Sequence, residues 1–228
     1  MEMNERIQLR NMTKTIGDKA IIRDVGFSVF RGEIVAFLGQ NGAGKTTTLK
    51  VAAGLYKADQ GEISIDGTSV LIPDDPLLYE ELTVREYIQM MKELHRVNAL
   101  PDHTAFRLEE ELEKKIKELS FGNKKKVALY TALIPKPNVL LLDEFISGID
   151  PLNMRLVKDL LRAYAAEGNA ILLSTHQLSV AQEFCDSCVL IQDGRILGEK
   201  VPLRTISETH SSLEDYFIHM MQEEHVHE

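Results

Sequence analysis

The 228-residue sequence predicts an α/β fold in which helices flank a mostly parallel sheet. Three short apolar runs carry this prediction, namely Ile34 to Leu38, Val139 to Asp143 and Ala170 to Thr175, and the last two end in polar residues. Runs of this kind are typical of strands buried on both faces of a parallel sheet. We expect the polar ends to meet at the edge of the sheet where ligands bind.

The first third of the chain is rich in short β-type runs. They include Ile7 to Leu9, Val25 to Phe30 and Glu62 to Gly67. We predict that they form an N-terminal antiparallel β subdomain beside the parallel sheet.

The middle of the chain predicts helices. Thr83 and Glu86 have the spacing of a capping box, and the apolar stripe after them predicts a helix that runs to about Arg96. We expect a second, highly charged helix over Phe106 to Leu119, with a solvated face. The sequence thus predicts a single domain over residues 1–228, with an inserted helical subdomain at about 77–130.

Composition narrows the function. The hydrophobic fraction of 44% is enough for a full core, and the formal charge of −9 argues against a general affinity for nucleic acid. No stretch approaches the ~20 apolar residues of a membrane span, and residues 1–6 lack the apolar region of a signal peptide, so we expect a cytosolic chain. Cys185 and Cys188 could be a redox pair or half a metal site, but we interpret them as core residues, because neither a second pair nor a nearby His completes a zinc set.

A glycine-rich loop follows the first apolar run and precedes a helix. The segment from Gly39 to Thr46 reads GQNGAGKT, which is the phosphate-binding loop of the P-loop NTPase core. Its glycines allow close backbone approach to a nucleoside triphosphate, while Lys45 reaches the β/γ-phosphates and the Thr46 hydroxyl ligates Mg²⁺. The candidate nucleotide-binding residues here are Gly39, Gln40, Asn41, Gly42, Ala43, Gly44, Lys45, Thr46 and Thr47.

The second chemical element is an acidic pair at the end of an apolar strand. We assign Asp143 to Mg²⁺ and the catalytic carboxylate Glu144 to the polarisation of an attacking water. Such a strand end is common by itself, and its meaning comes from the phosphate loop.

Three further segments complete a family resemblance. Leu119-Ser120-Phe121-Gly122-Asn123 falls where an LSGGQ signature is expected, residues 147–150 are similar to a D-loop, and Ser174-Thr175-His176 is similar to a switch histidine. In order and spacing these motifs resemble those of the ATP-binding subunit of an ABC transporter, over almost the whole chain.

The resemblance implies the cofactors and partners. It implies ATP with Mg²⁺, a catalytic role for His176, and a head-to-tail pair with a second ABC subunit, identical or different. It implies that Ser120, Gly122 and Asn123 contact phosphate in the opposing subunit, with Ser147 and Asp150 in the D-loop. It also implies a transmembrane permease as partner, hence a peripheral position on the cytoplasmic face of the membrane. From the residues alone, Ser120 is a helix N-cap that makes a second anion site or is only a cap, and Lys124 to Lys126 are a solvated face.

The sequence departs from the family pattern at several positions. Phe121 and Asn123 replace the first Gly and the Gln of the signature, and Phe145 stands where Pro is usual. Ile16 stands where the family usually stacks an aromatic on adenine. Asp74 falls where most members carry the Gln that senses Mg²⁺ and the permease, and we predict it as a metal ligand.

None of these departures removes the main catalytic groups, so we predict an active ATPase. Three functions stay in contention. The first is the motor of a membrane exporter, because residues 82–86 and 212–217 resemble bacterial export-type subunits. The second is a soluble ABC ATPase that acts on nucleic acid or ribosomes, and the third is a regulatory cassette that closes on ATP without turnover.

Overall fold

The computed structural model describes residues 4–224 and contains two sheets. The three-stranded sheet has the order β2-β1-β4, and the six-stranded sheet has the order β5-β6-β7-β3-β8-β9. The strands are β1 (Glu5–Ile16), β2 (Lys19–Phe30), β3 (Ile34–Leu38), β4 (Gln60–Ile65), β5 (Ser69–Ile72), β6 (Val139–Asp143), β7 (Ala170–Thr175), β8 (Ser187–Gln192) and β9 (Arg195–Pro202). The α-helices are α1 (Lys45–Ala52), α2 (Val84–Leu94), α3 (Phe121–Leu133), α4 (Pro151–Ala166), α5 (Leu178–Phe184), α6 (Leu203–Thr209) and α7 (Leu213–Glu224).

Strand pairing confirms the predicted α/β class. In the small sheet, β1 is antiparallel to both β2 and β4. In the large sheet, β5, β6, β7, β3 and β8 are parallel to their neighbours, and only β9 runs antiparallel at the edge. The predicted antiparallel unit and the mostly parallel sheet are therefore both present.

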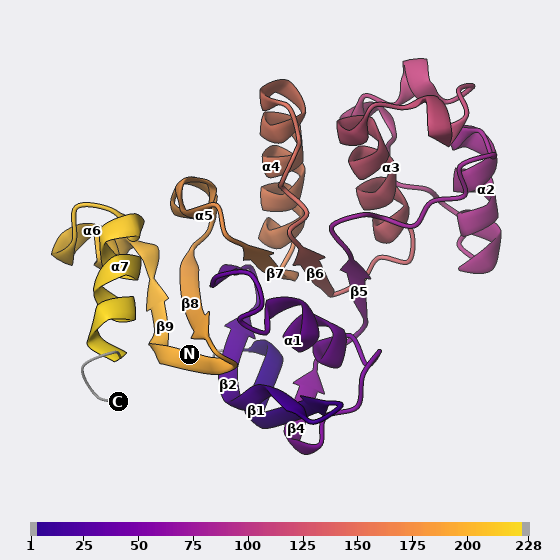
Figure 1. Ribbon diagram of the computed structural model, residues 1–228. Helices are drawn as coiled ribbons and strands as arrows, with labels where there is room; N and C mark the ends of the chain where they lie inside the picture. Colours follow the sequence, from indigo (N-terminus) through magenta and orange to yellow (C-terminus); the bar gives the residue numbers. More distant parts are fainter. Residues whose placement is uncertain (1–3, 225–228) are drawn as a thin grey trace.

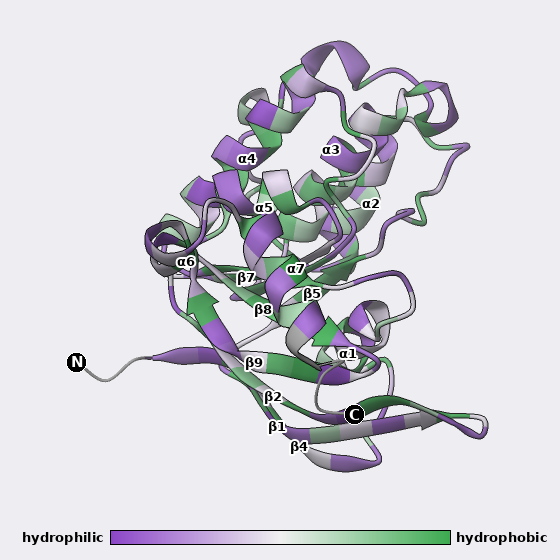
Figure 2. Ribbon diagram, turned by 60° about the vertical axis from the view of Figure 1, so that its left-hand side comes forward, coloured by the Kyte–Doolittle hydropathy of each residue, from purple (hydrophilic) through white to green (hydrophobic). Residues whose placement is uncertain are grey.

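The large sheet is buried on both faces because its central strands β6, β7 and β3 are apolar except at the carboxyl ends of β6 and β7. Val35 and Phe37 belong to a core shared with α1 and the small sheet, whereas Ile34, Ala36 and Leu38 belong to a second core shared with α3, α4 and α5. Figure 1 shows α1 between the two sheets, with α4 and α5 on the opposite side of the large sheet. In Figure 2, hydrophilic and hydrophobic residues alternate along α4 and α7, as expected for helices with one buried face.

The segment between β5 and β6 lies to one side of the large sheet and carries α2 and α3 (Figure 1). The predicted capping box of α2 is present, because the Thr83 side chain accepts from the Glu86 N–H and the Glu86 carboxylate accepts from the Thr83 N–H. The helix ends at Leu94, close to the predicted end, and Arg96 has a left-handed φ of 54°.

The predicted helix over Phe106 to Leu119 is wrong. The chain forms three short 3-10 turns there, η1 (Thr104–Phe106), η2 (Glu109–Glu111) and η3 (Ile116–Glu118). The reason is a competing backbone pairing: Val84 N–H donates to the Lys114 carbonyl at 3.0 Å, and Ile116 N–H donates to the Leu82 carbonyl at 2.9 Å. These bonds fix the segment along the start of α2 and leave it unable to form a continuous helix.

The solvated face predicted for Lys124 to Lys126 is also wrong. Lys125 and Lys126 are buried in α3, and Lys124 is only partly exposed. Helix α3 packs inside the molecule, so the run of charge does not mark a surface.

Cys185 and Cys188 are free and buried, which confirms their interpretation as core residues. Burial raises the pKa of both thiols, that of Cys188 to about 12. No helix within residues 4–224 has the length and apolar character to cross a bilayer.

Truncation of a large side chain in the core between the two sheets should cause a large loss of stability. Phe37 is fully buried, and its ring centroid lies 5.4 Å from that of Phe27. Phe37→Ala should lower the free energy of unfolding by about 3–5 kcal/mol, because it opens a cavity that the strands cannot close. Urea denaturation measures this, with the exposed Leu152→Ala as control, which should change stability by less than about 0.5 kcal/mol. Equal losses in the two variants would contradict the assigned core.

Candidate functional site

The register of three parallel strands assembles one site at their carboxyl ends. Leu38 at the end of β3 is paired with Thr175 of β7, and Asp143 at the end of β6 is paired with Ser174. The glycine-rich loop, the acidic pair and His176 therefore leave the sheet at the same edge. This confirms the expected meeting of the polar strand ends.

The glycine-rich loop needs its glycines. Gly42 and Gly44 have φ of 83° and 113°, in the left-handed region that disfavours other residues. A Cβ at Gly39 would lie 2.4 Å from the Ile191 carbonyl oxygen. Gly44 is also the N-cap of α1 and offers no side-chain cap, so the helix N-terminus keeps free N–H groups for an anion.

The loop borders a cavity of ≈ 340 Å³. Its lining residues are Lys19, Ile21, Asn41, Gly42, Gly44, Lys45, Thr46, Thr47 and Glu144. Gly39 and Ala43 are buried, and Gly39 and Gln40 line a neighbouring hollow with His176 and Phe217. Most of the predicted nucleotide-binding residues thus face one space.

The Lys45 side chain is held in place by backbone carbonyl groups of the glycine-rich loop. Its Nζ donates to the Gly39 carbonyl at 2.7 Å and to the Gln40 carbonyl at 3.1 Å. The same Nζ lies 3.4 Å from Glu144 Oε1. A buried ammonium therefore sits at the cavity wall with carbonyl partners that a phosphate could replace.

Glu144 connects the loop to His176. Its Oε2 lies 2.9 Å from His176 Nδ1, while its buried Oε1 has no hydrogen-bond donor. The backbone of Glu144 is left-handed, with φ of 45°, and its N–H donates to both the carbonyl and the Oγ of Ser174, each at 3.1 Å. The carboxylate is thus aimed into the cavity from a strained backbone position.

Asp143 is buried behind this carboxylate. Its Oδ1 accepts from Ser174 Oγ at 2.6 Å. One hydroxyl of Ser174 thus orders both acids, since it holds the Asp143 side chain and accepts from the Glu144 backbone. The sequence analysis used Ser174 only as part of a motif, and its place opposite Asp143 in the strand register is the signal that could have shown this role.

The signature segment opens α3 outside the cavity. Ser120 caps the helix and accepts from the Asn123 N–H at 3.3 Å, and Asn123 Nδ2 donates to Glu111 Oε1 at 3.0 Å. A Cβ at Gly122 would lie 3.1 Å from Asp150 Oδ2, so this position is tight against the start of α4. The signature residues are not among those that line the cavity at the phosphate loop.

The D-loop residues lie between these two regions. Asp150 caps α4 by accepting from the N–H groups of Leu152 and Asn153. Ser147 Oγ accepts from Gln177 Nε2 at 3.1 Å, which ties the D-loop to the residue after His176.

Two residues predicted for the site, Ile16 and Asp74, lie apart from the cluster of Lys45, Glu144 and His176. Ile16 is 46% exposed at the end of β1 and does not line the cavity, where Lys19 and Ile21 of β2 stand instead. Asp74 faces α3, with Oδ1 3.3 Å from Lys125 Nζ. Roles for Ile16 at the base and for Asp74 at Mg²⁺ stay predictions.

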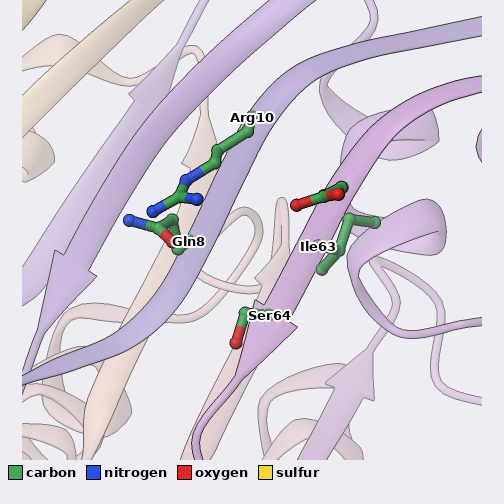
Figure 3. Close-up of a pocket in the computed structure, with 5 residues that line it drawn as sticks. Gln8, Arg10, Ile63 and Ser64 are labelled. Carbon is green, nitrogen blue, oxygen red and sulfur yellow. The ribbon is translucent and has the colours of Figure 1, made fainter.

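Another hollow, on strands β1 and β4 of the small sheet, lacks the site's features (Figure 3). It is lined by Gln8, Arg10, Glu62, Ile63 and Ser64. Gln8 pairs with Ser64 and Arg10 with Glu62 across the two strands, so their side chains stabilise the sheet as cross-strand neighbours.

The comparisons with known proteins agree with this geometry. The ABC transporter family model matches residues 22–147. An uncharacterized ABC transporter ATP-binding protein of Methanocaldococcus jannaschii is 36% identical over 200 residues, which is 85% of this chain and 76% of that protein. The Nod factor export ATP-binding protein I of Burkholderia orbicola is 37% identical over 215 residues, which is 86% of this chain and 71% of that protein. A solved structure of the ATP binding subunit of an ABC transporter has a TM-score of 0.84 and 32% identity, and the match covers 94% of this chain and 99% of that one.

From its position at the cavity, we predict that Lys45 contributes strongly to the affinity for nucleotide. Lys45→Ala should weaken ATP binding by about a hundredfold or more, because the phosphates lose charge-assisted hydrogen bonds from a buried ammonium. Equilibrium binding of a fluorescent ATP analogue measures it. Lys50→Ala is the matched control, since Lys50 lies on the same helix over the Tyr56 ring and outside the cavity lining. Equal affinities in the two variants would contradict the assigned site.

Proposed function

Because the chain belongs to the ABC transporter ATP-binding family, we propose that it binds ATP with Mg²⁺ and hydrolyses the ATP to drive a membrane exporter. The single observation that carries hydrolysis is the continuous set of contacts from Lys45 through Glu144 to His176. These contacts bring together, at one cavity, an ammonium that can bind phosphate, a carboxylate and an imidazole.

The residues present fit this nucleotide and metal. The left-handed glycines leave space at a helix N-terminus with free N–H groups, and the buried Glu144 Oε1 atom makes no hydrogen bond there and has only the Lys45 ammonium, 3.4 Å away. The Thr46 hydroxyl at the cavity and the buried Asp143 carboxylate are the oxygen ligands that Mg²⁺ prefers, with Asp74 proposed as a further one. When bound, Mg²⁺ neutralises charge on the phosphate oxygens.

Each side chain then has a definite task. Lys45 exchanges the carbonyls of Gly39 and Gln40 for phosphate oxygens, and this draws its Nζ away from Glu144. The carboxylate of Glu144, still oriented by His176 and by its backbone bonds to Ser174, accepts a hydrogen bond from the attacking water. His176 is exposed, so it can also reach the γ-phosphate.

The partners follow from what one chain leaves open. We propose that Ser120, Gly122 and Asn123 complete the phosphate contacts of a second ABC subunit, identical or different, with Ser147 and Asp150 at the contact between subunits. The support is that the signature lies outside the cavity of its own chain, at an exposed and capped helix start. A transmembrane permease would hold the pair on the cytoplasmic face of the membrane.

Export is supported by one class of relative. The Burkholderia orbicola protein carries export in its name, and residues 82–86, which form the capped start of α2 here, resemble export-type subunits. Two measurements distinguish the alternatives from this function. A regulatory cassette would bind ATP without turnover, and a soluble ABC ATPase would not co-purify with a permease.

Glu144→Gln tests the hydrolytic role. ATP binding should be unchanged within about threefold, while hydrolysis should fall by about 10²–10⁴-fold, because an amide cannot act as a base. Binding and single-turnover rates measure the two effects separately. The control is Glu208→Gln, an exposed change on α6. Wild-type turnover in Glu144→Gln would exclude Glu144 as the base, and a wild-type chain that binds ATP without turnover would favour the regulatory cassette.

Assembly gives a second test. In the Glu144→Gln background, ATP should drive two chains together, whereas ADP should leave monomers, because the γ-phosphate contact joins one chain to Ser120 of the other. Adding Ser120→Ala should weaken this pairing by about tenfold, which corresponds to ~1.4 kcal/mol. Thr83→Ala is the matched control, since it removes another helix N-cap away from the cavity. Sedimentation decides it, and a monomer at all concentrations with ATP would favour a different partner cassette.

A further inference from the structure

Lys125 is a buried ammonium at the meeting point of four segments. Its side chain is 0% exposed, and its Nζ donates to the Ser147 carbonyl at 2.7 Å and to the Glu144 carbonyl at 3.4 Å. A third contact is Asp74 Oδ1, at 3.3 Å. One atom of α3 thus touches the D-loop, the backbone of the proposed base and the loop that carries Asp74.

Three of the five residues that depart from the family pattern lie around this same atom. The Lys125 Nζ lies 4.6 Å from the ring centroid of Phe121 and 5.6 Å from that of Phe145, with the Asp74 carboxylate on another side. Aromatic faces attract a cation, and attract it more strongly when water is excluded. Three changes that are distant in sequence therefore form one enclosure for one charge.

The contact with Glu144 bears on the reaction. Glu144 holds a left-handed backbone, a conformation that costs a residue with a Cβ roughly 1–2 kcal/mol. Its N–H is held by Ser174, and its carbonyl accepts from the Ser147 N–H at 3.0 Å and from Lys125 Nζ at 3.4 Å. Lys125 also holds the Ser147 carbonyl, so it contacts the turn that fixes the Glu144 backbone and with it the direction of the carboxylate.

We propose that Lys125 is a positioning residue for hydrolysis, which sets the backbone of Glu144 and the D-loop and makes that setting depend on the carboxylate of Asp74. This inference rests on the proposed function. Among the described residues, the hydrogen bonds of Lys125 reach Asp74, Glu144 and Ser147 and no phosphate-loop residue, so it acts through Glu144 and Ser147. Asp74 Oδ1 lies 3.3 Å from Lys125 Nζ, so the exposed carboxylate pairs directly with the buried charge.

The test compares two neighbouring buried lysines. Lys125→Met keeps an unbranched side chain that is one atom shorter and removes the donor. Lys126→Met is the matched control, because Lys126 is also buried in α3, but its Nζ donates to the Arg107 carbonyl, at 3.4 Å, away from Glu144. Lys125→Met should lower kcat by about tenfold to a hundredfold with KM for ATP changed less than about threefold, since misplacement of a catalytic group affects turnover more than binding. Lys126→Met should change kcat by less than about threefold, and Lys125→Arg should recover part of the lost kcat.

Asp74→Asn tests the same contact by changing the exposed partner of Lys125. It can be measured alone if Lys125→Met does not fold. Alone it should lower kcat, and in the Lys125→Met background it should have no further effect, because both changes break the same contact. Multiplied effects would mean that Asp74 acts independently, for example at Mg²⁺, and would overturn the dependence on Asp74. Equal kcat in wild type, Lys125→Met and Asp74→Asn would overturn the inference alone, whereas a wild-type chain without turnover would overturn the proposed function with it.

Discussion

The register between β6, β7 and β3 is the constraint on which the site depends. Leu38 lies beside Thr175, and Asp143 beside Ser174, so the loops after the strands start at one level. A slip by one residue would exchange the two faces of a strand, and α1 and the helices on the far side would both lose their packing partners. Because each face belongs to a different hydrophobic core, the packing that stabilises the fold also sets the distances between Lys45, Glu144 and His176.

The same edge holds local features that oppose stability. Glu144 is left-handed, its buried Oε1 has an ion pair with Lys45 but no hydrogen bond, and Lys45 and Lys125 are buried ammonium groups. Buried charges and strained backbone persist only where surrounding contacts fix them. Here Ser174 and the carbonyls of Gly39, Gln40 and Ser147 provide those contacts. The two extensive cores carry the stability that such a site lowers.

The sequence predicts best what is local. The apolar strands, the glycine-rich loop and the capping box at Thr83 each depend on neighbouring residues, and all three are present. The helix over Phe106 to Leu119 fails because its backbone partners lie at and just before the start of α2, far back along the chain. The burial of Lys125 depends on a carbonyl in the D-loop, and Lys19 and Ile21 enter the cavity only through the turn between β1 and β2. These are tertiary contacts, and no periodicity or motif in the sequence encodes them.

The two cysteines have a consequence for the study of motion. Only a thiolate reacts with maleimides, and burial keeps Cys185 and Cys188 protonated and out of reach. The native cysteines of the folded chain therefore do not react with thiol reagents, and neither of them has to be removed. A single cysteine introduced on the surface becomes a unique position for a fluorophore or a spin label. Conversely, labelling of Cys188, which lies beside Ala36 in the sheet, records each time that β8 separates from β3.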